Sequence, residues 1–148
     1  MDKIISLSVK LHCTPEKAFQ YFVDDESLKT WLAEDAEVEP KIGGKYELFW
    51  DPNDRENNST LGCKITAMEA DKFICFEWRS PAQFKHFANQ ADPLTHVVVF
   101  FIPDDDVTEI HLVHSGWRSS AMWQEAFSWQ ERAWQMAFSA LQQLANKN

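Results

Sequence analysis

His114 is the side chain of this sequence that could most readily take part in chemistry. Period-two alternation over residues 107–115 predicts a strand in which His114 shares the inward face with Ile110 and Leu112. Because an imidazole titrates near neutral pH, an inward His114 could act as a general base or orient a polar group of a ligand. Alternatively, His114 is a core residue whose ring nitrogens are hydrogen-bonded to other protein groups. The sequence leaves these three roles, base, ligand contact and core residue, open.

A metal site is not indicated by the five histidines. His111 is three residues from His114 in the same predicted strand, so the two side chains face opposite ways. His96 could neighbour His114 across a hairpin, but two histidines leave a zinc site without its remaining ligands. We therefore expect neither a metal nor a cofactor.

Motifs for covalent or phosphoryl chemistry are missing from the sequence. It contains no GxSxG, Walker A or GxGxxG, and no pair of carboxylates is predicted to face inward. The cysteines form no CxxC motif and are odd in number, which favours buried reduced thiols over disulfides or a nucleophile: Cys13, Cys63 and Cys75. A non-enzymatic role is favoured.

Gln130 is a polar residue in an apolar setting. From residue 120 the chain has no Gly or Pro and reads as one helix. One group of apolar residues falls within about 60° of the helix and a second widens the arc to about 180°: Trp123, Phe127, Trp134, Phe138 and Leu141, then Met122, Trp129, Ala133, Met136 and Ala140. Gln130 lies near the middle of this arc, so its amide must bond a backbone carbonyl, a trapped water or a bound molecule.

The elements that would position these residues follow an α+β order. Residues 3–12 alternate as a strand, and Thr14-Pro15 and Asp24-Asp25 each begin a short helix. Antiparallel strands follow, with a proline-containing lid between the fourth and fifth: residues 37–39, 45–50, 61–66, 73–79, 96–102 and 107–115, with the lid at 80–93. The predicted fold is a curved sheet of about six further strands wrapped around the long C-terminal helix, in a single domain over residues 1–148.

Bulky aromatic residues are predicted to wall the space between sheet and helix. Alternation places Trp50, Phe76 and Trp78 on the concave side, opposite Arg79, and Trp134 faces them from the helix. Trp31 is expected to close one end of this space. A filled core is the alternative to a pocket, but a sheet curled over one helix seldom fills completely with rigid rings.

Composition limits the partners. The formal charge is −9 and the pI about 4.9, which excludes a basic surface for nucleic acid or for an anionic membrane. The longest apolar run, residues 97–102, is too short to span a bilayer, and the N-terminus lacks a signal-peptide pattern. We expect a cytoplasmic protein.

The sequence resembles the helix-grip, START-like (SRPBCC) superfamily, within the group related to the C-terminal domain of the activator of the heat-shock chaperone ATPase. Motifs in family order carry the resemblance: Thr14-Pro15-Glu16, Ala18-Phe19, Leu28 with Trp31, Gly43-Gly44, Glu77-Trp78, His114-Ser115-Gly116-Trp117 and the Trp-rich final helix. The resemblance implies a cavity that holds apolar ligands in many members and a chaperone-binding role in a few.

Three functional hypotheses follow. The first is non-enzymatic binding of a small hydrophobic molecule by seven residues: Trp31, Trp50, Phe76, Trp78, His114, Gln130 and Trp134. The second is a chaperone or stress-related interaction module that uses acidic residues and the loop 53–59. The third is a cyclase- or hydrolase-like enzyme with His114 as base. A homodimer through the stripe around Trp129 is also open.

Overall fold

The computed structural model describes residues 3–147 and begins with the predicted strand and two helices. Strand β1 is followed by α1, where Thr14 Oγ1 accepts a hydrogen bond from the backbone N–H of Lys17. Asp24 then ends α1 and caps α2 by accepting from the N–H of Ser27. These elements span Ile5–Leu11 (β1), Pro15–Val23 (α1) and Asp25–Trp31 (α2).

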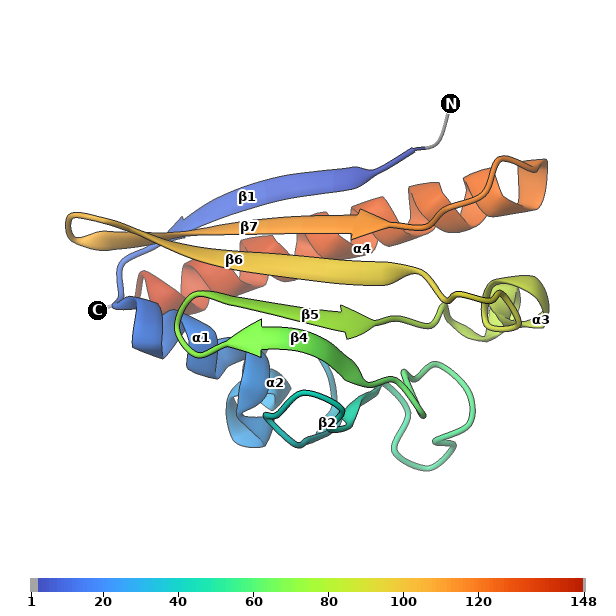
Figure 1. Ribbon diagram of the computed structural model, residues 1–148, viewed down its shortest axis with the longest axis horizontal. Coiled ribbons are helices and arrows are strands. Elements are labelled where there is room, and N and C mark those ends of the chain that lie inside the picture. Colours follow the sequence, from blue (N-terminus) through green and yellow to red (C-terminus); the bar gives the residue numbers. More distant parts are fainter. Residues whose placement is uncertain (1–2, 148) are drawn as a thin grey trace.

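Six further strands and β1 form two antiparallel sheets (Figure 1). The larger sheet has the order β1-β7-β6-β5-β4, and β2 pairs with β3. An isolated bridge between Lys45 and Lys64 links the two sheets. The strands are Asp35–Val38 (β2), Tyr46–Phe49 (β3), Ile65–Glu69 (β4), Phe73–Glu77 (β5), His96–Asp104 (β6) and Val107–Ser115 (β7).

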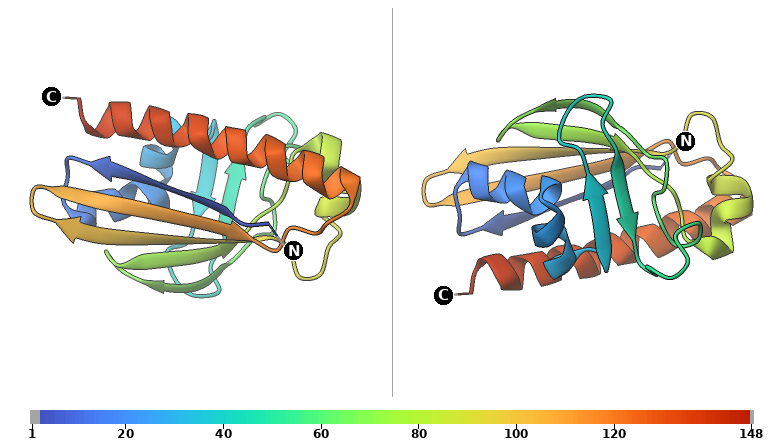
Figure 2. Two further views of the ribbon diagram at one scale, coloured as in Figure 1. Left: turned by 90° about the horizontal axis from the view of Figure 1, so that it is seen from above. Right: turned by 90° about the horizontal axis from the view of Figure 1, so that it is seen from below.

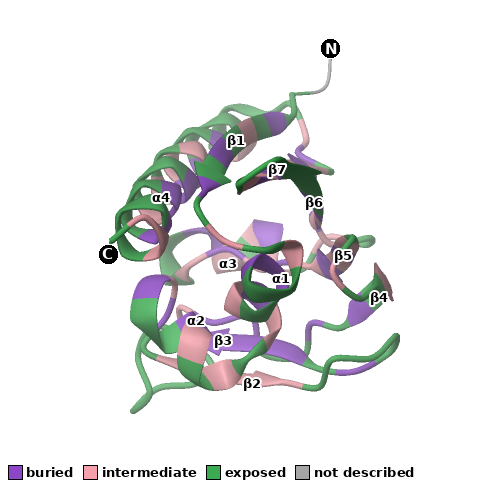
Figure 3. Ribbon diagram, turned by 90° about the vertical axis from the view of Figure 1, so that its left-hand side faces the viewer, coloured by how far each residue is buried: buried purple, intermediate pink, exposed green. Residues whose placement is uncertain are grey.

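Helix α4, Ala121–Ala145, begins at the N-cap Ser120 and runs beside β1, the edge strand of the larger sheet (Figure 2). Seen end-on, the strands curve around the interior and α4 closes the side they leave open (Figure 3). The helix buries a narrow row of large side chains against the sheet and α2: Phe127, Trp134, Phe138 and Leu141. Within residues 3–147 no helix is both long and apolar enough to cross a membrane.

The apolar arc of α4 is narrower than predicted. Met136 is 74% exposed and Met122 is 50% exposed, and Ala140 also faces solvent. The reason is that the sheet covers only one side of the helix, so the second apolar group lies beside the contact and not within it. The prediction of a fully wrapped helix is wrong for these three residues.

Two segments differ from their predicted form. Strand β4 begins at Ile65, because Gly62 has a φ of +87° and Leu61 turns outward with 41% exposure, so the alternation around Cys63 is not a strand. The lid segment is helical: a 3-10 turn, Ala82–Phe84, leads into α3, Lys85–Ala88. Phe84 and Phe87 pack against Trp129 and Trp123 of α4.

Candidate functional site

A cavity of about 240 Å³ lies where α4 passes the ends of β3 and β5. Tryptophan dominates its wall, and no acidic residue contributes to it. Trp50 is 37% exposed, so it stands where the cavity meets solvent. The lining residues are Leu32, Trp50, Asn58, Ser59, Trp78, Arg79, Pro81, Trp129, Gln130, Ala133, Trp134 and Ala137.

The strand ends and successive turns of α4 bring the indoles together. Trp50 follows β3 and Trp78 follows β5, and their rings meet edge to face with centroids 5.8 Å apart. Trp78 also contacts Trp134 of α4 with centroids 5.0 Å apart. Trp129 lies on the same helix, a little more than one turn before Trp134.

Hydrogen bonds from the indole N–H groups hold three of these rings in place. The Trp50 Nε1–H donates to the backbone oxygen of Leu32 over 2.8 Å. The Trp134 Nε1–H donates to Nδ1 of His114 over 3.0 Å, and the Trp78 Nε1–H donates to Oε1 of Gln130 over 3.2 Å. Since their N–H groups are occupied, these indoles offer apolar carbon surface to whatever enters, in positions already set.

Gln130 is buried, and its partner is the side chain of Trp78, not the backbone carbonyl, water or bound molecule considered from the sequence. An indole N–H can only donate, so the amide oxygen faces Trp78 and the NH2 group is the remaining polar end of Gln130. Within residues 3–147 that NH2 group has no hydrogen-bond partner, but it is not fully buried, and Gln130 borders the cavity.

Arg79 was predicted to lie on the outer face, and this is wrong. Strand β5 ends at Glu77, so strand alternation no longer governs Arg79, which borders the cavity. Its Nη1 donates to the backbone oxygen of Asn89 over 3.0 Å. Its Nε is the one buried side-chain nitrogen or oxygen of the described residues that has no hydrogen-bond partner. The Ser80-Pro81 step that ends the strand pattern was the available signal.

Three predicted site residues are not in this lining. His114 is fully buried, and burial, reinforced by His96, lowers its pKa to about 3. Phe76 lies deeper in the core, where it stacks on Tyr46 with centroids 3.8 Å apart. Trp31 does not close the cavity, because α2 turns it into the core, where its Nε1–H donates to the Tyr21 backbone oxygen.

The ring nitrogens of His114 are both engaged. Because Trp134 donates to Nδ1, the neutral ring carries its proton on Nε2, which donates to Thr95 Oγ1 over 3.0 Å. A general base at this position would have to give up the bond to Trp134. Its geometry is therefore that of a buried support for Trp134 and not of the base considered in the enzyme hypothesis.

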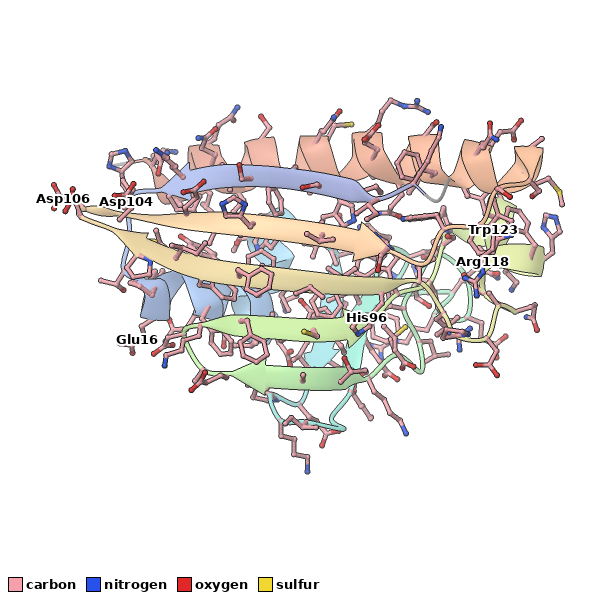
Figure 4. All side chains as sticks on the ribbon, turned by 45° about the horizontal axis from the view of Figure 1, so that its top comes forward. Glu16, His96, Asp104, Asp106, Arg118 and Trp123 are labelled. Carbon is pink, nitrogen blue, oxygen red and sulfur yellow. The ribbon has the colours of Figure 1, made fainter. Side chains whose placement is uncertain are left out.

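The remaining candidates for chemistry are separated in space. His96 pairs with Ser115, not with His114, and contacts Thr66 through Nε2 on the other face of the sheet (Figure 4). The cysteines are free, and burial raises the pKa of the Cys63 thiol to about 12. Across residues 3–147 no three or more His, Cys, Asp or Glu side chains gather in a way that could hold a metal.

A long helix held along a curved antiparallel sheet, with an apolar cavity beside it, defines the START-like, helix-grip class of proteins. The chain belongs to a family within it, described as Activator of Hsp90 ATPase homolog 1-like protein, whose model matches residues 12–146. A search of curated proteins found no match.

Solved structures of low sequence identity share the fold. A protein from Mesorhizobium loti is 19% identical with a TM-score of 0.76, covering 96% of each chain. The Aha1 dimer from Colwellia psychrerythraea is 17% identical with a TM-score of 0.75, covering 98% of this chain and 97% of that one. An HSP90 activator from Plasmodium falciparum is 21% identical with a TM-score of 0.72, covering 95% and 94%.

Proposed function

We propose that this chain binds a small hydrophobic molecule in the cavity beside α4, without catalysing a reaction on it. The observation that carries the proposal is a cavity of about 240 Å³ whose indole walls are held by hydrogen bonds before anything enters. Preset apolar walls lower the entropic cost of binding, since few side chains must be ordered by the ligand.

The volume sets the size of the ligand. An engineered apolar cavity of about 150 Å³ binds benzene. A cavity of about 240 Å³ therefore suits a compound of about one or two fused rings, or a short branched chain, and not a membrane lipid with two acyl chains.

The predicted site residues divide into two groups in this proposal. Trp50, Trp78, Gln130 and Trp134 would contact the ligand, because they line the cavity. The other three would support them: His114 bonds Trp134, Phe76 lies beside Trp78 with centroids 6.0 Å apart, and Trp31 packs on Phe138, which in turn packs on Trp134.

The test is to fill the cavity from α4. Ala133 lines it, whereas Ser139 lies on the exposed polar side of the same helix and outside the cavity, so Ala133→Phe and Ser139→Phe form a matched pair. Thermal-shift and native mass-spectrometry screens would use naphthalene derivatives, indoles and eight-carbon chains. We expect compounds that bind the wild type and Ser139→Phe to bind Ala133→Phe at least tenfold more weakly.

Two results would count against the proposal. One is a wild-type protein that binds no compound of the panel more tightly than millimolar. The other is an Ala133→Phe variant that folds and keeps wild-type affinity for the compounds found.

A second candidate function is interaction with a chaperone, favoured by the family of the chain and by an ordered acidic loop. Arg55 fixes the loop that follows β3 by pairing with Asp35 and Glu37 and by lying over the Phe49 ring, 4.1 Å from its centroid. The acidic residues of the loop stay exposed, so a charged partner surface could meet them.

Charge reversal in this loop tests the second candidate. We expect immobilised Hsp90 to retain the wild type and the control Asp106→Lys/Glu125→Lys, and to lose most of Asp54→Lys/Glu56→Lys. All four positions are exposed, so fold stability should change little. Equal retention of both double variants, or none of the wild type, would refute the interaction through this loop.

We also propose that the chain forms a homodimer through the exposed apolar side of α4. Met122, Met136 and Leu144 are all exposed there, and Ala140 lies between the last two. The similar Aha1 from Colwellia psychrerythraea, solved as a dimer, supports this assembly. Exposed apolar side chains that share one side of a helix can mark an interaction surface, and a second copy would cover them.

A further inference from the structure

We propose that the ligand of this cavity is a small organic acid, with a flat apolar body among the indoles and a carboxylate at Arg79 and Gln130. The inference rests on the proposed ligand-binding function and names the chemical class of the ligand. Its basis is the set of polar groups that the cavity leaves unused.

The hydrogen-bond acceptors of the lining side chains are already engaged. Oε1 of Gln130 accepts from the Trp78 indole, and Oδ1 of Asn58 accepts from the backbone N–H of Ala82 over 2.9 Å. The Ser59 hydroxyl donates to the backbone oxygen of Arg55 and accepts from the N–H of Leu61. A ligand that brings only donors would therefore find few free partners.

The unused groups are donors. The Arg79 Nε–H is buried without a partner. The NH2 of Gln130, another lining residue, is not fully buried but also has no partner within the described residues. A buried unsatisfied donor is costly, so an acceptor brought by a ligand gains both the new bond and the removal of that cost. The ligand should present oxygen acceptors at this end of the cavity.

The positive charge of Arg79 indicates that the acceptor group of the ligand is an anion. A guanidinium is always ionised, yet Arg79 forms no salt bridge with any carboxylate of residues 3–147. None of the twelve lining residues is acidic, so the protein supplies no counter-ion inside the cavity. A carboxylate offers two acceptor oxygens and a matching charge, and charge-assisted bonds are the stronger ones. A neutral carbonyl would satisfy one donor and leave the charge uncompensated.

A matched pair of probes tests this without altering the protein. 2-Naphthoic acid and 2-naphthamide have the same rings and nearly the same shape, but only the acid is charged at neutral pH. Isothermal titration calorimetry of the wild-type protein should give an affinity for the acid at least tenfold higher than for the amide.

Two variants assign the preference to one side chain. Arg79→Gln should bind acid and amide about equally, with the affinity for the amide kept. Arg132→Gln removes the same charge from the exposed face of α4 and should keep the wild-type preference. Melting curves check that both variants fold. If Arg79→Gln does not fold, the comparison of acid and amide on the wild-type protein still tests the proposal.

The outcomes separate the two proposals. If the wild type binds the amide as tightly as the acid, the cavity binds apolar molecules and the organic-acid proposal is overturned. If a folded Arg79→Gln keeps the preference for the acid, the role of Arg79 is overturned. If neither probe binds and no arene of the wider panel does, the ligand-binding function itself fails.

Discussion

At the scale of single residues, the most telling arrangement is the chain Trp134–His114–Thr95. It is buried from end to end, and each hydrogen bond in it determines the next: the indole fixes the imidazole tautomer, and the imidazole then donates to the hydroxyl. The position of a cavity wall, Trp134, thus depends on a neutral histidine beneath it.

Acid should therefore destabilise the fold. A histidine in an unfolded chain has a pKa of about 6.5, whereas that of His114 in the folded protein is lowered to about 3. Between these pH values the unfolded chain takes up a proton that the folded protein excludes. The stability that the neutral His114 contributes is therefore fully present above about pH 6.5 and is lost progressively as the pH is lowered toward about 3. We expect a loss of up to about 1.4 kcal/mol per pH unit, measured by urea unfolding.

His114→Gln is the matched variant for this prediction, because its amide can still accept from Trp134 but does not titrate. Its unfolding free energy should change less with pH than that of the wild type. His12→Gln serves as the control, because residue 12 is exposed and lies outside the buried chain Trp134–His114–Thr95. Its pH profile should follow that of the wild type. Parallel pH profiles of the wild type and His114→Gln would contradict the assignment.

At the scale of elements, sequence reasoning succeeded where the determinants are local. The cap at Thr14, the following Pro15 and the cap at Asp24 lie within a few residues of the hydrogen bonds they make, so α1 and α2 could be located from the sequence. The β6–β7 hairpin was equally accessible, because its alternation is long and its turn is polar.

Elements set by distant contacts were not accessible in this way. The residues before β4 alternate like a strand, but Thr60 bonds both Leu48 N and Tyr46 O of β3, which holds this stretch as a connection between the two sheets. The outward side of α4 is equally a matter of how far the sheet extends, and nothing in the helix itself encodes that limit.

The candidate site shows the same division. Trp50, Trp78, Gln130 and Trp134 were found from periodicity, because each lies in or next to a regular element. The bond between Trp78 and Gln130 joins residues 52 positions apart, and no local pattern reveals it. Arg79 was misplaced because the strand rule was extended two residues beyond the end of β5.

At the scale of the whole molecule, the exposed row on α4 yields a prediction about assembly. Met136→Glu places a charge at the most exposed of the large apolar side chains of residues 3–147. Burying such a side chain is worth about 1.5–3 kcal/mol, so this variant should weaken the proposed dimer at least tenfold. Sedimentation velocity over a range of concentrations measures the shift to monomer.

Gln135→Glu introduces the same charge one residue away, on the polar and exposed side of the helix, and should leave the dimer intact. A wild-type protein that stays monomeric at every concentration would refute the proposed homodimer. Equal dissociation of both variants would mean that charge, and not the methionine contact, controls association.

Four of the seven tryptophans in the chain border one cavity. The emission of an indole depends on its immediate surroundings, so a ligand that enters the cavity would change the surroundings of these four indoles. An aromatic guest should quench or shift that light in proportion to occupancy. The molecule thus carries a built-in optical reporter, and titrations can be followed at low concentration without any attached dye.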